Sequence, residues 1–450
     1  MVGTTKEAMS FFITAKDTGQ KIEQVDLSYL ITDKNKEFPT IKVNRHKTRQ
    51  KILGFGGAFT EASASVYEKL GAEKRAEIIQ SYFGINGNRY NMGRTHINSC
   101  DFSLGNYSYC DTPGDIELKK FSISRDKKLL IPFIADALEA TQIPIKLLAS
   151  PWSPPPWMKT NGEMNHGGKL KKEYRHAWAQ YYCKYISAYE KEGITIWGIS
   201  IQNEPDAKQT WDSCLYTGDE ERDFIRNYLG PAMERNNLLH KKIIIWDHNR
   251  DIMVERARAV LSDPEAEKYV WGTGFHWYNG DHFDAVQQVH DEFPDKKLIF
   301  TEGCQENGPH LGSWDLGERY ATSIINDLNR WTVAWIDWNL ILDESGGPNH
   351  VGNYCSAPII VDTQTQDILY QSSYYYLGHF SRFIKRDDRI IESKNETKNL
   401  LALASINSSG STTVVLMNKN NSKEDFNYIE GDKNLNLSIP ARSIVTLVSE

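Results

Sequence analysis

Short apolar runs alternate with helix-like stretches along most of the chain, from about residue 50 to residue 375. A nearly continuous apolar run bounded by Pro or Gly is typical of a buried parallel strand. Eight such runs occur, at residues 52–58, 90–96, 144–150, 196–205, 243–247, 271–276, 298–304 and 332–338. Helical patterning fills the gaps, for example at 174–182 and 316–325. Eight strand-then-helix units predict a closed (β/α)₈ TIM barrel, whose active site lies at the carboxyl ends of its strands.

The two ends of the chain show a different pattern. Short apolar strands separated by Asn, Ser, Gly and Lys turns occur at residues 11–14, 40–43, 400–404, 413–417 and 444–448. Such spacing is typical of an antiparallel β-sandwich. We therefore predict an α/β protein with a catalytic barrel over residues 51–379. The attached antiparallel β-sandwich is built from both termini, residues 1–50 plus 380–450.

Composition and charge exclude some classes of function. The chain has 450 residues, of which 40% are hydrophobic and 25% charged, as in ordinary globular proteins. A net charge of −7 and the lack of a Lys/Arg-rich block argue against nucleic acid as a partner. The sequence gives no indication of the oligomeric state.

Targeting signals and cysteines bear on localisation. The six cysteines are scattered without a Cys-x-x-Cys pair, which favours reduced thiols in a cytoplasm. Residues 1–6 lack the apolar stretch of a secretory signal, and no run is long enough to cross a bilayer. We expect a cytoplasmic protein without an integral membrane segment, with unconventional secretion left open.

Two glutamates stand where predicted strands end. Glu204 lies near the end of the run at 196–205, and Glu302 near the end of the run at 298–304. A strand-end glutamate can instead cap or ion-pair with the next helix, and each motif alone is weak. As a pair on one barrel, however, they can act as general acid/base and nucleophile on one glycosidic bond.

These two roles require different protonation states. The acid, Glu204, has to be protonated, so its pKa is expected to be raised by desolvation or by the second carboxylate. The nucleophile, Glu302, has to be ionised. Arg94, expected at another strand exit, and Tyr278 are the residues that would keep Glu302 ionised.

Aromatic and polar side chains accompany the glutamates. Trp152 lies in a proline-rich loop, and Trp338 ends the last predicted strand. Indole rings have an apolar face suited to the C–H face of a sugar, whereas sugar hydroxyls require polar partners. Trp157 and Trp277 could either contact a ligand or cover the barrel rim. The polar candidates for a pyranose pocket are Asp101, Asn203, Asp337, Asn339 and Asn353.

No motif indicates a cofactor or a metal. The glycines at 54–57 are not followed by Lys-Ser/Thr, so we expect a tight turn at the barrel mouth rather than a phosphate site. The twelve histidines are dispersed without His-Glu-x-x-His, and Gly-x-Ser-x-Gly is absent. We therefore predict neither a metal nor a cofactor.

Taken together, the motifs resemble those of glycoside hydrolase family 30. Within the family they are similar to the branch that contains lysosomal glucosylceramidase (acid β-glucosidase) and its bacterial relatives. The resemblance runs from about Gly54 to Phe383. The segments that carry it lie at residues 54–61, 99–103, 148–153, 202–205, 275–278, 301–304, 336–339, 344–349 and 377–381.

The resemblance implies a retaining β-glycosidase on a barrel with an attached β-sandwich. It implies that Glu204 is the acid/base and that Glu302 is the nucleophile. With the neighbouring Phe102 included, the implied substrate-binding residues are Asp101, Phe102, Trp152, Asn203, Trp338 and Asn353. The implied shell around the nucleophile consists of Arg94, His276 and Tyr278.

We therefore predict a retaining exo-β-glycosidase of the glucosylceramidase or β-glucosidase type, acting on a β-linked glycoside or glycolipid in carbohydrate or sphingolipid metabolism. The secretory signal and the disulfide-bearing N-terminal region of the lysosomal enzyme are not visible, which favours a bacterial-type member. A β-xylosidase or a β-1,6-glucan-cleaving hydrolase is the alternative. A non-catalytic carbohydrate-binding protein is the candidate from another class, but it predicts loss of a carboxylate, and both are present. The sequence does not determine the sugar, the aglycone or exo against endo action.

Overall fold

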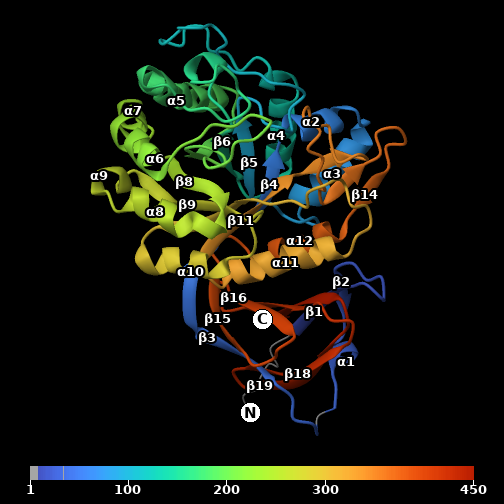
Figure 1. Ribbon diagram of the computed structural model, residues 1–450. Coiled ribbons are helices and arrows are strands. Elements are labelled where there is room, and N and C mark those ends of the chain that lie inside the picture. The colour runs from blue at the N-terminus through green and yellow to red at the C-terminus, as the bar shows by residue number, and fades with distance from the viewer. Residues whose placement is uncertain (1–8, 34, 450) are drawn as a thin grey trace. The chain divides into compact units, whose positions relative to one another are not determined.

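The computed structural model describes residues 9–33 and 35–449 (Figure 1). Residues 1–8, on which the expectation of a missing export signal rests, lie outside the described residues. The chain separates into two compact units. One comprises the described residues up to Gly54, Gly312–Ala334 and the described residues from Tyr370 onward, and the other comprises Phe55–Leu311 and Trp335–Leu369. The domain boundaries given above stay a prediction.

Eight parallel strands of the described chain close into a barrel, which confirms the fold predicted from the apolar runs. They are β4 (Gly54–Phe59), β5 (Met92–Ile97), β6 (Lys146–Pro151), β7 (Ile196–Ser200), β8 (Lys242–Asn249), β9 (Val270–His276), β10 (Lys297–Glu302) and β11 (Thr332–Asn339). Strands β4, β5 and β11 are buried at every position. Continuous burial explains why the runs are apolar without alternation, since both faces of such a strand pack against other side chains.

Helices follow most of the barrel strands (Figure 1). The α-helices are α1 (Leu27–Leu30), α2 (Glu61–Glu68), α3 (Ala72–Phe83), α4 (Leu130–Ala140), α5 (Arg175–Lys191), α6 (Gly218–Phe224), α7 (Gly230–Arg235), α8 (Met253–Leu261), α9 (Pro264–Glu267), α10 (Phe283–Glu292), α11 (Asp315–Leu328) and α12 (Ser372–Ser381). Short 3₁₀ turns are η1 (Asp126–Lys128), η2 (Pro156–Met158), η3 (Lys172–Tyr174) and η5 (Arg250–Ile252), and η4 (Ile225–Leu229) is a π-helical turn. Among the helices that the structure describes, none is long and apolar enough to cross a membrane.

A nine-stranded sheet within the described chain joins strands from both termini, as predicted. The strands are β1 (Met9–Ala15), β2 (Glu23–Val25), β3 (Thr40–Lys51), β15 (Arg389–Asn395), β16 (Leu400–Ile406), β17 (Thr412–Asn418), β18 (Glu424–Glu430), β19 (Lys433–Ile439) and β20 (Ser443–Ser449). Their order is β19-β18-β3-β15-β16-β17-β20-β1-β2, and β18 pairs with β3 in parallel. Apolar residues from strands across this order share one buried cluster, the sandwich core.

A small third sheet follows the barrel and was not predicted. It contains β12 (Ile341–Asp343), β13 (Ile359–Val361) and β14 (Ile368–Tyr370), and β12 pairs with β13 in parallel. The chain between β12 and β13 forms a loop, residues 344–358, that brings Asn353 to the barrel. Three-residue strands are too short to give a periodic signal in the sequence.

The glycines at 54–57 lie inside β4, so the expectation of a turn at the barrel mouth is wrong. A Cβ atom on Gly56 would lie 1.9 Å from the carbonyl oxygen of Met92 on β5. The close approach of the two backbones, rather than a left-handed turn, is therefore what requires glycine at this position.

Candidate active site

One cavity of about 190 Å³ collects the side chains predicted to act on the substrate. Glu302 ends β10, Trp152 follows β6, and Trp338 is near the end of β11, so the cavity lies at the carboxyl ends of the barrel strands. Its lining consists of Asp101, Phe102, Trp152, Asn203, Glu204, Gln209, Trp211, His248, Asn249, Tyr278, Glu302, Cys304, Glu306, Trp338, Asn353 and Cys355. Both glutamates and all six predicted substrate-binding residues are in this set.

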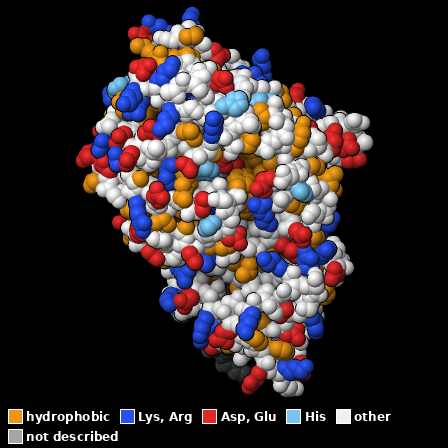
Figure 2. All heavy atoms as spheres, viewed as in Figure 1, with side chains coloured by type: hydrophobic (Ala, Val, Ile, Leu, Met, Phe, Trp, Pro, Cys, Tyr) orange, Lys and Arg blue, Asp and Glu red, His pale blue; other side chains and the backbone are white. Residues whose placement is uncertain are grey.

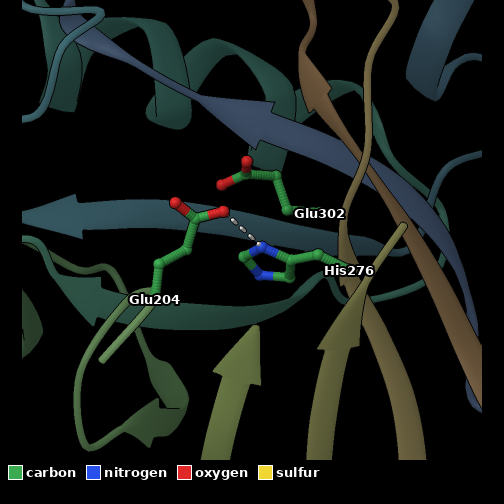
Figure 3. Close-up of side chains that lie close together, drawn as sticks. All are labelled: Glu204, His276 and Glu302. Carbon is green, nitrogen blue, oxygen red and sulfur yellow. Dashed lines mark hydrogen bonds and ion pairs between the residues drawn. The ribbon is translucent and has the colours of Figure 1, made fainter. Parts of the chain in front are cut away.

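The two glutamate side chains point toward each other, Glu302 from the end of β10 and Glu204 from the turn after β7 (Figure 3). A carboxylate oxygen of Glu204, a carboxylate oxygen of Glu302 and a ring nitrogen of His276 all lie within 4.8 Å of one another. Carboxyl groups of retaining glycosidases stand about 5–5.5 Å apart, whereas inverting pairs need about 6.5–9.5 Å to admit a water molecule. The observed spacing therefore suits a nucleophile and an acid/base acting on one bond.

Glu204 does not lie in a strand. β7 ends at Ser200, and Glu204 adopts a left-handed φ of 48° in the turn that follows. Its N–H donates to the carbonyl oxygen of Asp247 at 3.0 Å, and its own carbonyl accepts from Ala207 N–H at 3.0 Å. Such a conformation in a residue other than glycine is costly and persists only where the surroundings hold it. The turn places the carboxylate in the cavity.

Arg94 is fully buried inside β5, rather than at a strand exit as expected, and it connects several groups of the site. Its Nη1 donates to Glu302 Oε2 at 2.5 Å, and its Nη2 donates to Asn203 Oδ1 and to Asp247 Oδ2, each at 2.8 Å. The guanidinium also lies 4.8 Å from the centre of the Trp152 ring. Arg94 thus positions the predicted nucleophile, the asparagine before the predicted acid and one indole of the cavity wall.

Tyr278 holds the other oxygen of the predicted nucleophile. Its hydroxyl donates to Glu302 Oε1 at 2.9 Å and lies 3.5 Å from the sulfur of Cys304. Each oxygen of Glu302 therefore has a donor, one from Arg94 and one from Tyr278, as the sequence interpretation expected. Donors on both oxygens fix the orientation of the carboxylate in the cavity.

Asp247 is a central residue that the sequence analysis missed. Its Oδ2 accepts from Arg94 and from Ser200 Oγ at 2.5 Å, and its Oδ1 accepts from Thr301 Oγ1 at 2.5 Å and from His276 Nε2 at 3.0 Å. Burial alone would raise the pKa of this carboxyl, but Arg94 and His276 outweigh burial and hold the pKa far below its usual range. A signal was available, because the run at 243–247 ends in an acidic residue as the two glutamate runs do.

His276 bridges two carboxylates. Its Nδ1 lies 3.2 Å from Glu204 Oε1 (Figure 3), and its Nε2 lies 3.0 Å from Asp247 Oδ1. Burial lowers the pKa of the imidazole, but the charges of Glu302, Asp247 and Glu204 outweigh burial and raise the pKa to about 9. We therefore assign an imidazolium that donates both N–H groups. The resemblance placed His276 around the nucleophile, whereas its hydrogen bonds go to the predicted acid/base and to Asp247.

The pKa shifts of the two glutamates are opposite to those expected. Burial raises the pKa of Glu302, and the negative charge of Glu204 raises it further, against His276 and Arg94. Burial also raises the pKa of Glu204, but His248 and His276 outweigh it, and the net shift is downward. The expectation of a raised pKa at Glu204 is therefore wrong for this structure, because both imidazoles contact that glutamate.

Asp101 forms the polar end of the cavity. Its Oδ2 accepts from Asn353 Nδ2 at 2.9 Å and from Asn349 Nδ2 at 3.3 Å. Burial is the main reason that the pKa of Asp101 rises to about 8, although the hydrogen bond from Asn353 lowers it. Two amide groups thus orient a buried carboxyl that can accept from sugar hydroxyls.

Three aromatic rings form one wall of the cavity. The rings of Trp152 and Trp338 stack with centroids 5.2 Å apart and planes 23° apart. Phe102 meets Trp338 edge-on, with centroids 6.0 Å apart. Together these rings form an apolar surface on the cavity that Asp101 also lines.

Four residues considered from sequence do not line the cavity. Asp337 and Asn339 are buried in β11, where alternation directs them away from the side on which Trp338 lies. Trp157 Nε1 donates to the carbonyl of Cys110, and Trp277 Nε1 donates to the carbonyl of Cys304. The two indoles therefore have structural partners, which favours the rim-covering interpretation.

Comparison with known proteins assigns the family. Residues 52–384 match the glycosyl hydrolase family 30 TIM-barrel domain, and residues 389–447 match the glycosyl hydrolase family 30 beta sandwich domain. The chain belongs to glycosyl hydrolase family 30. It is therefore a glycoside hydrolase, and its substrate is a glycoside.

Several proteins are similar to this family 30 protein over most of its length. It is 40% identical over 407 residues to the lysosomal acid glucosylceramidase of Mus musculus, which covers 86% of this chain and 78% of the mouse protein. The structure of SrfJ from Salmonella typhimurium superposes with a TM-score of 0.93 at 36% identity, over 98% of this chain and 99% of SrfJ. The endo-β1,6-glucanase BT3312 superposes with a TM-score of 0.88 at 26% identity, over 99% of each chain.

The spacing of Glu204, His276 and Glu302 is one at which a metal ion could be held. The charges nearby disfavour a cation in this family 30 site, however. Arg94 already occupies one oxygen of Glu302, and His276 would have to lose a proton whose pKa is about 9. The charges of these groups therefore fit a bound cation poorly.

The sequence analysis missed most of the outer lining of the family 30 cavity. These residues lie at the end of β8, in the loops after β7 and β10 and in the loop at 344–358, where no periodic signal marks them. They are Gln209, Trp211, His248, Asn249, Cys304, Glu306 and Cys355. On the face shown in Figure 2, acidic and basic side chains are interspersed.

The raised pKa of His276 predicts a pH-dependent contribution to stability. The folded pKa of about 9 exceeds the ordinary value of 6.5. The contribution is therefore complete below pH 6.5 and is lost as the pH rises through about 9. For His276→Asn, we expect the loss in the free energy of unfolding to be largest below pH 6.5 and to shrink by on the order of 3 kcal/mol at pH 9.5. Urea unfolding of the wild type and of His276→Asn at each pH measures this loss.

Ser200→Ala is the control, because it changes the same hydrogen-bond network without removing a group that titrates in this range. Its destabilisation should stay constant from pH 5.5 to pH 9.5. A His276→Asn deficit that is equally independent of pH would contradict the imidazolium assignment.

Proposed function

We propose that this family 30 enzyme is a retaining exo-β-glycosidase that hydrolyses β-glucosides by a double displacement, with a glucosylceramidase-like specificity. The observation that carries the proposal is the pair of glutamates, whose oxygens lie within 4.8 Å of each other at one cavity. The 40% identity to the mouse lysosomal acid glucosylceramidase supports the choice of sugar.

In the first step, Glu302 attacks the anomeric carbon while Glu204 gives its proton to the leaving oxygen. The bond from the anomeric carbon to that oxygen breaks, and an ester forms between the sugar and Glu302. The reactive form of the pair has its proton on Glu204. Arg94 and Tyr278 donate to both oxygens of the Glu302 carboxylate in that form, and so favour it electrostatically.

In the second step, Glu204 acts as the base. Esterification removes the negative charge of Glu302, which had raised the proton affinity of its neighbour. The His276 imidazolium then stabilises Glu204 as a carboxylate that takes a proton from water. The hydroxide equivalent attacks the anomeric carbon, the ester bond breaks, and the sugar leaves with its original configuration.

The shape of the cavity supports exo action on one sugar ring. Its volume of about 190 Å³ is below the roughly 300–1,000 Å³ of pockets for drug-sized ligands. Trp152, Trp338 and Phe102 close one side, and Asp101 with Asn353 closes the polar end. A polysaccharide that extends from the site on both sides of the cleaved bond would have to displace these groups.

A second candidate is cleavage of β-1,6-glucan. The likeness to the endo-β1,6-glucanase BT3312 over 99% of both chains supports it. Gln209, Trp211 and Glu306 line the cavity and offer polar and aromatic contacts for a further sugar unit. This candidate shares the catalytic pair and differs only in the leaving group.

A substrate panel separates the candidates. We expect hydrolysis of nitrophenyl β-glucoside and of glucosylceramide in detergent micelles, with free glucose as the first product. Nitrophenyl β-xyloside and linear β-1,6-glucan should be cleaved more slowly. Chromatography of the products distinguishes glucose from oligosaccharides, and early release of oligosaccharides from β-1,6-glucan would favour the endo-acting candidate.

Removal of the nucleophile should abolish turnover. Glu302→Gln keeps the size of the side chain and its ability to hydrogen-bond, but it cannot form the ester. The value of kcat should therefore fall by about 10³-fold or more. Intact-mass spectrometry with a 2-fluoro β-glucoside should show one sugar attached to the wild type, at Glu302, and none to the variant. Near-normal activity in a folded Glu302→Gln variant would refute the assignment.

Removal of the acid should depend on the leaving group. For Glu204→Ala, we expect a loss of about 10²–10⁴-fold with alkyl glucosides, which need protonation of the leaving oxygen. Activated aryl glucosides need little protonation and should lose less in the first step. Initial rates for a series of leaving groups measure the difference, and equal losses across the series would contradict the acid role.

A further inference from the structure

Strand β8 is irregular where it reaches the cavity. Its pairing with β9 shifts register between Trp246 and His248, and Trp246 and Asp247 have left-handed φ angles of 69° and 54°. Neighbouring residues of a regular strand face opposite sides. Here two consecutive side chains serve one site: Asp247 contacts Arg94 and His276, and His248 lines the cavity.

His248 faces the predicted acid/base. Its Nε2 lies 4.0 Å from Glu204 Oε1, the same oxygen that His276 Nδ1 approaches to 3.2 Å. The centroids of the two imidazole rings are 6.3 Å apart, and the ring planes are inclined by 70°. Glu204 Oε1 is therefore flanked by two histidines, of which the mechanism above uses only His276.

The surroundings of His248 favour a neutral ring. Its Nδ1 is buried and has no hydrogen-bond partner among the described residues, so a proton there would leave a buried N–H unsatisfied. The groups around the ring are Glu204 and Asp206 from the turn after β7, His276 from β9 and Asp251 from η5. Burial lowers the pKa of His248, and the positive His276 lowers it further, against the three carboxylates.

We propose that His248 is a positioning residue for Glu204: its neutral imidazole carries the ring proton on Nε2, directs that N–H dipole at Oε1 and favours the carboxylate form of the glutamate. The inference rests on the acid/base role of Glu204 in the proposed function. At 4.0 Å the interaction is electrostatic rather than a direct hydrogen bond, and the low polarity of a buried cavity strengthens it.

The sign of the effect follows from the chemistry of the first step. Glu204 has to be protonated to act as the acid, so kcat/KM falls with rising pH as this proton is lost. Groups that stabilise the carboxylate move that fall to lower pH. The other charged groups that act on Glu204 are His276, Arg94 and the carboxyl of Glu302. His248 thus shifts the alkaline limb of the pH–rate profile to lower pH.

The test compares two substitutions of one residue. His248→Phe keeps an aromatic ring and removes the N–H, and we expect the alkaline limb of kcat/KM to move upward by about 0.5–1 pH unit. His248→Gln retains an N–H donor and should keep the limb of the wild type. His166→Phe is the control, because that histidine is exposed and pairs with Glu163 away from the cavity lining. An unchanged limb in His248→Phe, or equal shifts in both His248 variants, would overturn the proposal.

A second measurement does not depend on catalysis. Ring ¹⁵N NMR of the histidine-labelled wild type should show His248 neutral from pH 6.5 to pH 8, with its proton on Nε2. A charged His248 at pH 7, or a proton on Nδ1, would overturn the proposal even if His248→Phe failed to fold. If the NMR result holds and Glu204→Ala shows no dependence on the leaving group, the proposed acid/base role fails while the ring assignment stands.

Discussion

The active site depends on one buried electrostatic network, in which Arg94 and His276 neutralise the carboxylates of Asp247, Glu204 and Glu302. Removing these groups from water is costly, and mutual attraction offsets the cost only when every donor and acceptor is satisfied. That condition holds at Asp247, which accepts four hydrogen bonds from four different strands. The barrel can place the pair of glutamates at short range because this network holds the positive charges beneath them.

The network also makes the two glutamates unequal. Glu302 receives hydrogen bonds from Arg94 and Tyr278 on its two oxygens, whereas Glu204 has imidazoles at one oxygen. The nucleophile is thus fixed in orientation, and the acid/base is adjusted in proton affinity. A retaining mechanism needs both properties, because one glutamate must attack along one line and the other must donate and then accept a proton. The asymmetry comes from neighbours, since the two side chains are chemically identical.

Several features of the fold were predictable from the sequence because they depend on local periodicity. The barrel strands are buried on both faces and read as apolar runs, and the terminal strands read as short runs between turns. Strands such as β18 and β19 alternate polar with apolar residues and were missed. The glycines of β4 were misassigned to a turn, because the sequence does not show that a neighbouring backbone lies in contact with Gly56.

The sequence by itself determined the number of barrel units, the contribution of both termini to one sheet, and two glutamates near the ends of strands. Only the tertiary structure decided which further side chains meet those glutamates. The bulge in β8 turns Asp247 and His248 toward one site, and the turn after β7 gives Glu204 its left-handed backbone. The charge on each group then follows from burial and from partners on β5, β9 and β10. Those partners are distant along the chain, so the register between strands, rather than any local pattern, sets their distances.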